Sequence, residues 1–144
     1  RRYLALYVLS GFAGNVGSFI FSNNVSVGAS TAVFGLLAAE GVFLYQNREM
    51  FGQQANRALS QVLMIAAVNL VIGMGPGIDN FGHIGGLVGG ALFAWFAGPL
   101  LRVSGFYPSY ASVDQREARN VLLTGIGVSA VFILLAALTL FLRS

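Results

Sequence analysis

The segment that decides the fold of this chain covers residues 79–90 and has the sequence DNFGHIGGLVGG. It opens an apolar stretch that continues to Leu101. Its glycines repeat at a spacing of four, in the pairs Gly85 with Gly89 and Gly86 with Gly90. Small residues at this spacing let the backbones of neighbouring membrane helices approach closely. The segment therefore predicts a tightly packed transmembrane helix, with His83 on the same face as Gly86 and Gly90.

The composition around this segment indicates that lipid is the main solvent of the chain. Hydrophobic residues make up 56% of the 144 positions and charged residues 9%, and the mean hydropathy is +0.76. A soluble domain carries roughly a quarter charged residues. So few charges cannot cover a surface in water, and we expect an all-α, polytopic transmembrane helix bundle.

Five apolar segments approach the length of about 20 residues that a membrane-spanning helix needs. They cover residues 3–21, 30–45, 58–74, 81–101 and 121–142. The stretches between them are polar or break helices, as Gly75-Pro76-Gly77 does after the third segment. The longest polar stretch begins at Arg102 and separates the last two segments.

The arginines orient these segments. Five crossings place seven of the eight arginines on one side, namely Arg1, Arg2, Arg48, Arg57, Arg102, Arg116 and Arg119. The other side has Arg143 alone. The positive-inside rule places the arginine-rich side in the cytoplasm or its organellar equivalent. We expect an integral multi-pass protein of the bacterial cell membrane, with an organellar membrane as the alternative.

Ser30 and His83 are the candidate catalytic residues. Each stands near the start of a segment that enters from the arginine-poor side, so both are expected at similar depth. The segment that begins at Ser30 has about 15 apolar residues, and at about 1.5 Å per residue it falls short of a ~30 Å hydrocarbon core. Ser30 is therefore expected below the membrane surface, under a polar cap from residues 22–26.

The pairing of these two residues matters more than either residue alone. A serine beside glycine and alanine is commonly a packing residue, and a lone histidine is commonly an interhelical hydrogen-bonding group. A serine hydroxyl becomes a nucleophile when a base such as neutral imidazole lies within hydrogen-bond distance. Phe34, one turn after Ser30, is expected to pack against the imidazole ring.

The two segments, in this order and spacing, resemble the rhomboid family of intramembrane proteases. Its Gly-x-Ser-Gly motif, which opens the fourth core helix, is matched by Gly28-Ala29-Ser30. Its His-x-x-Gly-x-x-x-Gly motif, in the sixth core helix, is matched from His83 to Gly90. Residues 3–11 are similar to the third core helix, and Asp79-Asn80 before the histidine recurs in many members. The resemblance covers roughly residues 1–101.

The resemblance implies a serine protease that cleaves transmembrane segments of membrane proteins in the lipid bilayer. His83 would deprotonate Ser30, whose oxygen attacks a peptide bond, and water would hydrolyse the acyl-enzyme. The Ser30 N–H would stabilise the oxyanion, with Gly28 and Phe34 as supporting residues. The family uses no cofactor, no metal and no third acid, and Asp79 is expected to cap its helix instead.

Two features depart from the family pattern. Thr31 stands where the family usually has glycine. The family's second helix, with a His-x-x-x-Asn pattern that helps to bind the oxyanion, has no counterpart here. We therefore expect a fragment of a longer protein, which pairs with its missing N-terminal helices or with other membrane subunits. Its expected parts are a partial rhomboid core at 1–101, a cytoplasmic-side loop at 102–119 and an extra C-terminal transmembrane helix at 120–144.

Other functions fit the sequence less well. A non-catalytic rhomboid-like protein that binds transmembrane segments, or a subunit of a larger membrane complex, is the main alternative. A channel or transporter lacks support, because no ring of charges or inverted repeat is visible. The arginines are scattered and there is no lysine, which argues against a protein that binds nucleic acid. The absence of cysteine excludes thiol chemistry, and one histidine argues against a histidine-based metal site.

Overall fold

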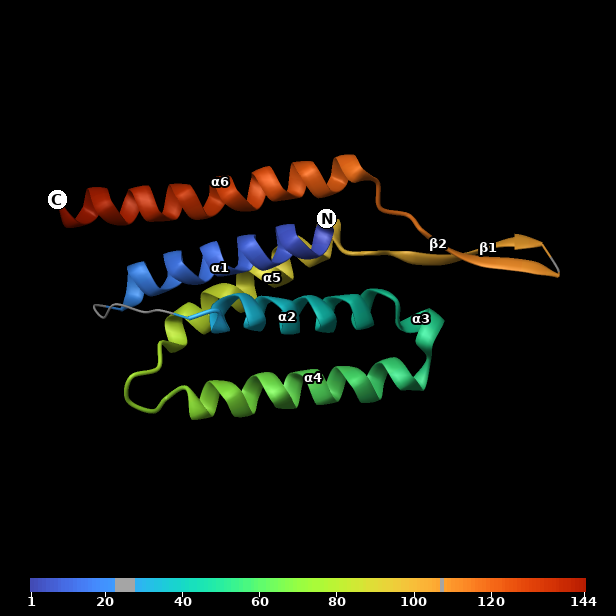
Figure 1. Cartoon of the computed structure of the whole chain (residues 1–144), viewed down its shortest axis with the longest axis horizontal. Coiled ribbons are helices and arrows are strands. Elements are labelled where there is room, and N and C mark those ends of the chain that lie inside the picture. Colours follow the sequence, from blue (N-terminus) through green and yellow to red (C-terminus); the bar gives the residue numbers. More distant parts are fainter. Residues whose placement is uncertain (23–27, 107) are drawn as a thin grey trace.

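The computed structural model describes residues 1–22, 28–106 and 108–144. Its elements in chain order are α1 (Arg2–Phe21), α2 (Ser30–Gln46), α3 (Arg48–Phe51), α4 (Gln53–Ile72), α5 (Asn80–Ala97), β1 (Leu101–Phe106), β2 (Ser109–Asp114) and α6 (Ala118–Arg143). Figure 1 shows the long helices side by side, with a β hairpin projecting from one end. The predicted helical bundle is confirmed. Apart from Ser22, the expected polar cap falls outside the described residues.

Three helices of the described chain, α1, α4 and α6, are long and apolar enough to cross a membrane. Only 11% of the apolar window of α4 and of α6 is buried in the protein. Large side chains such as Ile72 and Leu134 point outward, with 61% and 68% of their surface exposed. Exposing apolar surface to water costs about 25 cal/mol per Å², so these faces require lipid. That all five predicted segments cross the membrane stays a prediction.

Helix α5 is the centre of the bundle and packs against both α1 and α2. Its two rows of glycines contact different neighbouring helices. Gly85 and Gly89 face α1, and a Cβ atom on either would collide with Ala13. Gly86 and Gly90 face α2, and a Cβ atom on either would collide with the α2 backbone. The repeated glycines therefore let one helix contact two others at backbone distance.

The two ends of the bundle carry different charge. The N-terminus, α3 and the hairpin lie together at one end, and the C-terminus lies at the other (Figure 1). The segments that carry seven of the eight arginines meet at the first end, which we call the arginine end. Arg143 lies at the opposite end and donates to the Ile20 carbonyl at 2.9 Å. That the arginine end faces the cytoplasm stays a prediction.

The structure differs from the expected segments in two places near the arginine end. Helix α5 ends at Ala97 instead of Leu101, because Pro99 forces the preceding Gly98 into an extended conformation with ψ of 154°. Helix α4 begins at Gln53, so the polar residues before Ala58 form helix instead of loop.

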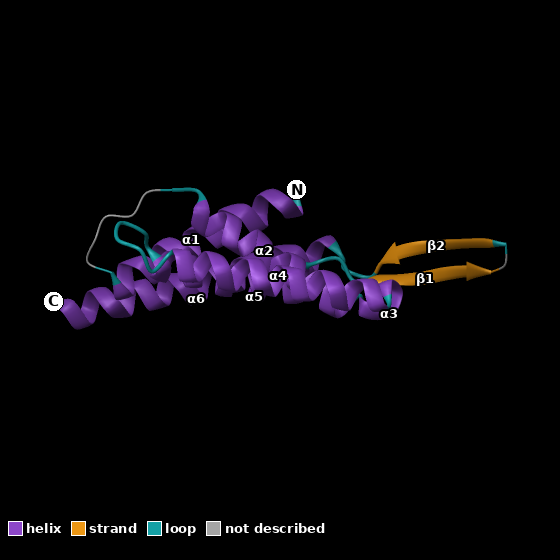
Figure 2. Cartoon of the chain, turned by 90° about the horizontal axis from the view of Figure 1, so that it is seen from below, coloured by secondary structure: helices purple, strands orange, loops and turns teal. Residues whose placement is uncertain are grey.

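The stretch predicted as a loop, residues 102–119, largely forms the hairpin of β1 and β2. The strands pair antiparallel from Leu101 opposite Asp114 to Phe106 opposite Ser109, and the hairpin extends beyond the helices (Figure 2). β-branched and aromatic residues such as Val103 favour strands. A lone two-stranded hairpin is marginally stable in water, and here its base is held by the helices. The Asn47 side chain accepts from the Leu101 N–H at 2.6 Å and donates to the Pro99 carbonyl at 3.0 Å.

Asp114 also anchors the hairpin, through an ion pair with Arg2 of α1. Burial raises the pKa of Asp114, but hydrogen bonds from the Arg116 N–H, the Arg2 guanidinium and the Leu100 N–H outweigh it and lower the pKa below 3.8. A lowered carboxyl pKa contributes stability that is present above the ordinary value and is lost as pH falls through the lowered value. The anchor is therefore expected to hold at pH 5 and above.

We expect the amide chemical shifts of the hairpin, measured by NMR in micelles, to stay constant from about pH 7 to about pH 5 and to move at lower pH. The Asp114→Asn variant removes this titrating group and should abolish the movement at the residues next to position 114, whereas the residues around the Arg102–Glu49 ion pair serve as an internal control. Equal pH dependence in the variant and in the original chain would contradict the anchoring role of the carboxylate.

Candidate active site

Ser30 and His83 meet at the end of the bundle opposite the arginine end. Ser30 is the first residue of α2, and His83 lies in the first turn of α5. The Nε2 atom of His83 is 2.9 Å from the Ser30 Oγ atom, within hydrogen-bond distance. Ser30 is exposed, whereas His83 is only 7% exposed. The contact follows from the packing of α5, since the glycine row that includes Gly86 and Gly90 lies on the face that meets α2.

Phe34 holds the imidazole from one side. Its ring stacks on the His83 ring with a centroid distance of 4.2 Å and an interplanar angle of 18°. Phe34 is 8% exposed, so its position is fixed by the surrounding helices. Stacking of this kind restricts the rotation of the histidine ring and keeps Nε2 directed at Ser30.

Asn80 determines which nitrogen of His83 carries the proton. The Asn80 Nδ2 atom donates to the carbonyl of Leu70 in α4 at 2.8 Å, which leaves the Asn80 Oδ1 atom facing the His83 Nδ1 atom at 3.3 Å. A carbonyl oxygen can only accept, so Nδ1 must carry the hydrogen in the neutral ring. The lone pair of Nε2 is then free to accept the Ser30 proton. A Cβ atom on Gly73 would collide with the Asn80 amide, so this contact needs a glycine at the C-cap of α4.

Asp79 takes the capping role that its position predicts. It is the N-cap of α5, and its Oδ1 atom accepts from the Gly82 N–H at 3.1 Å. An N-cap of this kind stabilises a helix by about 1 kcal/mol. The Nδ1 atom of His83 faces the Oδ1 atom of Asn80.

Thr31 is buried where α1, α2 and α5 meet. Its side chain lies beside Gly14 and Gly82, and a Cβ atom on Gly14 would stand 2.6 Å from the Thr31 Cβ atom. Two glycines on neighbouring helices therefore leave room for the threonine. Gly28 precedes Ser30 and is exposed, and a Cβ atom there would stand 3.6 Å from the Ser30 Oγ atom. Glycine at this position leaves that side of the hydroxyl open.

The structure brings Ser30, His83, Phe34 and Gly28 to one place and puts Gly86 and Gly90 behind them as packing residues. Asn80 is a site residue with no role predicted from the sequence. The sequence signal for this role is that Asn80 lies three residues before His83, because residues three apart in a helix have their side chains on one face. Among the described residues no group of three or more His, Cys, Asp or Glu side chains could hold a metal ion.

This arrangement can transfer a proton from a serine hydroxyl to a neutral imidazole. Ser30 is exposed to an incoming carbonyl carbon, and the N-terminus of α2 carries partial positive charge from its unpaired N–H groups. Ser30, His83 and Asn80 form one continuous line of contacts, with the Ser30 Oγ atom against the His83 Nε2 atom and the His83 Nδ1 atom against the Asn80 Oδ1 atom. The chemistry available to such a site is acyl transfer.

Comparison with known proteins identifies the family of the chain. The Rhomboid domain family matches residues 1–100. Rhomboid protease GluP of Bacillus subtilis (strain 168) is 35% identical over 132 residues, which cover 91% of this chain and 24% of that protein. RHOMBOID-like protein 4 of Arabidopsis thaliana is 40% identical over 113 residues, 78% of this chain and 27% of that protein. Inactive rhomboid protein 1 of Danio rerio is 37% identical over 119 residues, 82% of this chain and 13% of that protein. The chain thus spans about a quarter, or less, of the length of these relatives.

Proposed function

The chain belongs to the Rhomboid family, and we propose that it carries the catalytic serine and histidine of an intramembrane serine protease. The observation that carries the proposal is the 2.9 Å contact between the Ser30 Oγ atom and the His83 Nε2 atom. The GluP relative is named a rhomboid protease, and this name supports a protease activity for this chain. The proposed substrates are transmembrane segments of other membrane proteins, which reach Ser30 from the lipid. The proposed location is the bacterial cell membrane.

In the proposed reaction His83 acts as general base and then as general acid. Its Nε2 atom takes the Ser30 proton while the Oγ atom attacks the carbonyl carbon of the scissile peptide bond. The imidazolium that forms keeps its Nδ1–H directed at the Asn80 Oδ1 atom. The proton then passes to the leaving nitrogen, and the C–N bond breaks. The Nε2 atom then deprotonates a water molecule, whose oxygen attacks the acyl carbon. The bond from this carbon to the Ser30 Oγ atom breaks, and Nε2 returns the proton to Oγ.

The negative charge of the tetrahedral intermediate develops beside the N-terminus of α2. The Ser30 N–H belongs to the first turn of this helix, and Ala29 provides no side-chain cap. Backbone N–H groups at a helix N-terminus stabilise an anion, and an oxyanion donor typically contributes a factor of about 10²–10³ in rate. We propose the Ser30 N–H as the donor from this chain.

The second candidate is a non-catalytic protein that binds transmembrane segments. The observation that favours it is the 37% identity to a relative named inactive. Such a protein needs neither a serine within hydrogen-bond distance of its histidine nor an asparagine that sets the histidine tautomer. The contacts of Ser30 and Asn80 with His83 therefore favour the protease.

A serine-directed fluorophosphonate probe tests the proposal. In the full-length protein, in detergent or liposomes, the probe is expected to label Ser30, and labelling should disappear in Ser30→Ala and His83→Ala. The matched control is Ser60→Ala, because Ser60 is an exposed serine whose Oγ atom donates to the Asn56 carbonyl. Equal labelling of the Ser30→Ala variant would reject Ser30 as the nucleophile. No labelling of the original protein would reject the protease in favour of the binding protein.

Asn80→Ala should lower kcat about 10-fold to 100-fold with little change in KM, because the histidine loses the group that sets its tautomer and orientation. Asn80→Asp keeps an oxygen that accepts from Nδ1 and should recover part of the rate. Asn69→Ala is the control, since Asn69 is an exposed asparagine that donates only to its own helix, to the Ile65 carbonyl. An unchanged kcat in Asn80→Ala would exclude the orienting role.

A further inference from the structure

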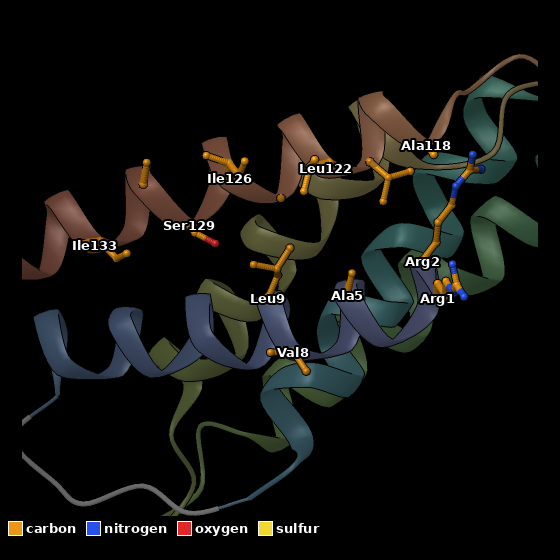
Figure 3. Close-up of a pocket in the computed structure, with 13 residues that line it drawn as sticks. Arg1, Arg2, Ala5, Val8, Leu9, Ala118, Leu122, Ile126, Ser129 and Ile133 are labelled. Atoms are coloured by element: carbon orange, nitrogen blue, oxygen red, sulfur yellow. The ribbon is translucent and has the colours of Figure 1, made fainter.

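A groove of about 860 Å³ runs between α1 and α6, on the side of the bundle away from α4. Figure 3 shows Leu9, Leu122 and Ile126 directed into the space between the two helices, with Arg1 and Arg2 at one end. Among the described residues that line it, Ser129 has the only hydroxyl and none has an acidic side chain. The Ser30 and His83 side chains are not part of this lining, so the groove is separate from the proposed active site.

The groove is too short for a membrane-spanning helix. Its wall runs from Arg1 to Leu9 along α1 and from Ala118 to Ile133 along α6. At about 1.5 Å per residue these walls are about 12 Å and about 22 Å long, against a ~30 Å hydrocarbon core. Deeper in the bundle the space is filled by a buried cluster that includes Ala13, Val16, Val128 and Phe132. An acyl chain from one leaflet matches these dimensions.

The polar end of the groove carries net positive charge. Within the described part of the chain the ion pairs are Arg2 with Asp114 and Arg102 with Glu49, so Arg1 has no carboxylate partner there. Arg2 keeps part of its side chain exposed, at 30%. Basic pockets between transmembrane helices bind the head groups of anionic lipids.

We propose that this groove binds one anionic phospholipid from the leaflet at the arginine end. The lipid phosphate lies against the Arg1 guanidinium, and an acyl chain lies between Leu9 of α1 and Ile126 of α6. The apolar lining favours the acyl chain, and the charge of Arg1 selects an anionic over a zwitterionic head group. The bound lipid joins α6 to α1 at the end where the hairpin emerges.

Gly125 and Gly127 of α6 offer a matched pair for the test. Gly125 lines the groove, and a Cβ atom there would stand 3.8 Å from the Leu9 Cδ1 atom. Gly127 lies two residues further on the same helix, with no atom within 4 Å of a built Cβ. Phenylalanine at position 125 therefore fills the groove, and phenylalanine at 127 points away from it. Ser129→Leu is a second way to narrow the groove if the first variant does not fold.

The experiment is native mass spectrometry of the detergent-purified full protein, incubated with equal amounts of phosphatidylglycerol and phosphatidylcholine that share the same acyl chains. We expect about fivefold preferential retention of phosphatidylglycerol, which corresponds to about 1 kcal/mol, the contribution of one basic residue near an anionic lipid. Arg1→Gln should remove the preference, and Arg57→Gln, at the same end but outside the groove, should not. Gly125→Phe and Ser129→Leu should lower retention, and Gly127→Phe should not.

Four outcomes would overturn the proposal. The first is equal retention of the two lipids by the original protein. The second is equal retention by the Gly125→Phe and Gly127→Phe variants. The third is displacement of the lipid by soluble glycerol phosphate, which would indicate a head-group site that does not use the groove. A dimer that dissociates in Gly125→Phe, without any retained lipid, would assign the groove to a second copy of the chain instead.

Discussion

Replacing Ser30 with alanine is expected to lower cleavage of a transmembrane substrate by at least about 10³-fold, because the variant has no nucleophile. Ser30 is exposed and begins α2, so the fold should tolerate the change. His83→Ala should lower the cleavage rate by about the same factor, since the two residues act as one unit. For the same reason, the double variant should cleave no more slowly than either single variant. The measurement is the rate of cleavage of a single-span membrane protein by the full-length protein in liposomes.

The control for this prediction is again Ser60→Ala, which should cleave at the original rate. If Ser30→Ala retained cleavage, another residue would be the nucleophile and the proposed mechanism would be wrong. If the original protein cleaved no transmembrane substrate, while Ser30→Ala still captured the same segments, the chain would be a binding protein.

The second large effect is expected at Gly86. A Cβ atom there would collide with the Thr31 carbonyl in α2, so Gly86→Ala should push α5 away from α2. Overpacking of this kind typically costs about 1–3 kcal/mol of stability. The same shift should lengthen the distance of 2.9 Å between His83 and Ser30, so activity should fall about 100-fold. The measurements are unfolding in a detergent titration and the rate of fluorophosphonate labelling.

Gly127→Ala is the control for Gly86→Ala, because nothing lies within 4 Å of its built Cβ atom. Both changes replace glycine with alanine inside a helix, so the gain in helix propensity is the same and only the contact differs. A Gly86→Ala variant as stable and as reactive as Gly127→Ala would show that the close approach of α5 to α2 is not needed.

The helices and the identity of the paired residues could be predicted from the sequence because both depend on local signals. Apolar runs and the breaks between them place the long helices, and the spacing of His83 from Gly86 and Gly90 puts these three residues on one face. Successive long helices run in opposite directions, so the starts of α2 and α5, with Ser30 and His83, lie at the same end of the bundle. The Asp79 cap is equally local, since the side chain and the Gly82 N–H that it binds are three residues apart.

Other features depended on contacts between segments that are far apart in the sequence. Residues 101–114 form a hairpin where a loop was predicted. The hairpin depends on pairing between its two strands, and its base is held by Asn47, between α2 and α3, and by Arg2 of α1. Asn80 needs the Leu70 carbonyl of α4 before its amide has a defined orientation. The groove between α1 and α6 joins residues more than 100 positions apart.

By itself, the sequence determined that this chain is a helical membrane protein and that Ser30 and His83 lie near the same ends of their helices. Hydropathy and residue spacing act within each segment, so both can be recognised without the tertiary structure. Only the tertiary structure decided that Gly85 and Gly89 face α1 while Gly86 and Gly90 face α2. The spacing of the two glycine rows is the same, so either row could have met either neighbour. Packing of three helices at backbone distance selected one arrangement, and that arrangement directs His83 at Ser30.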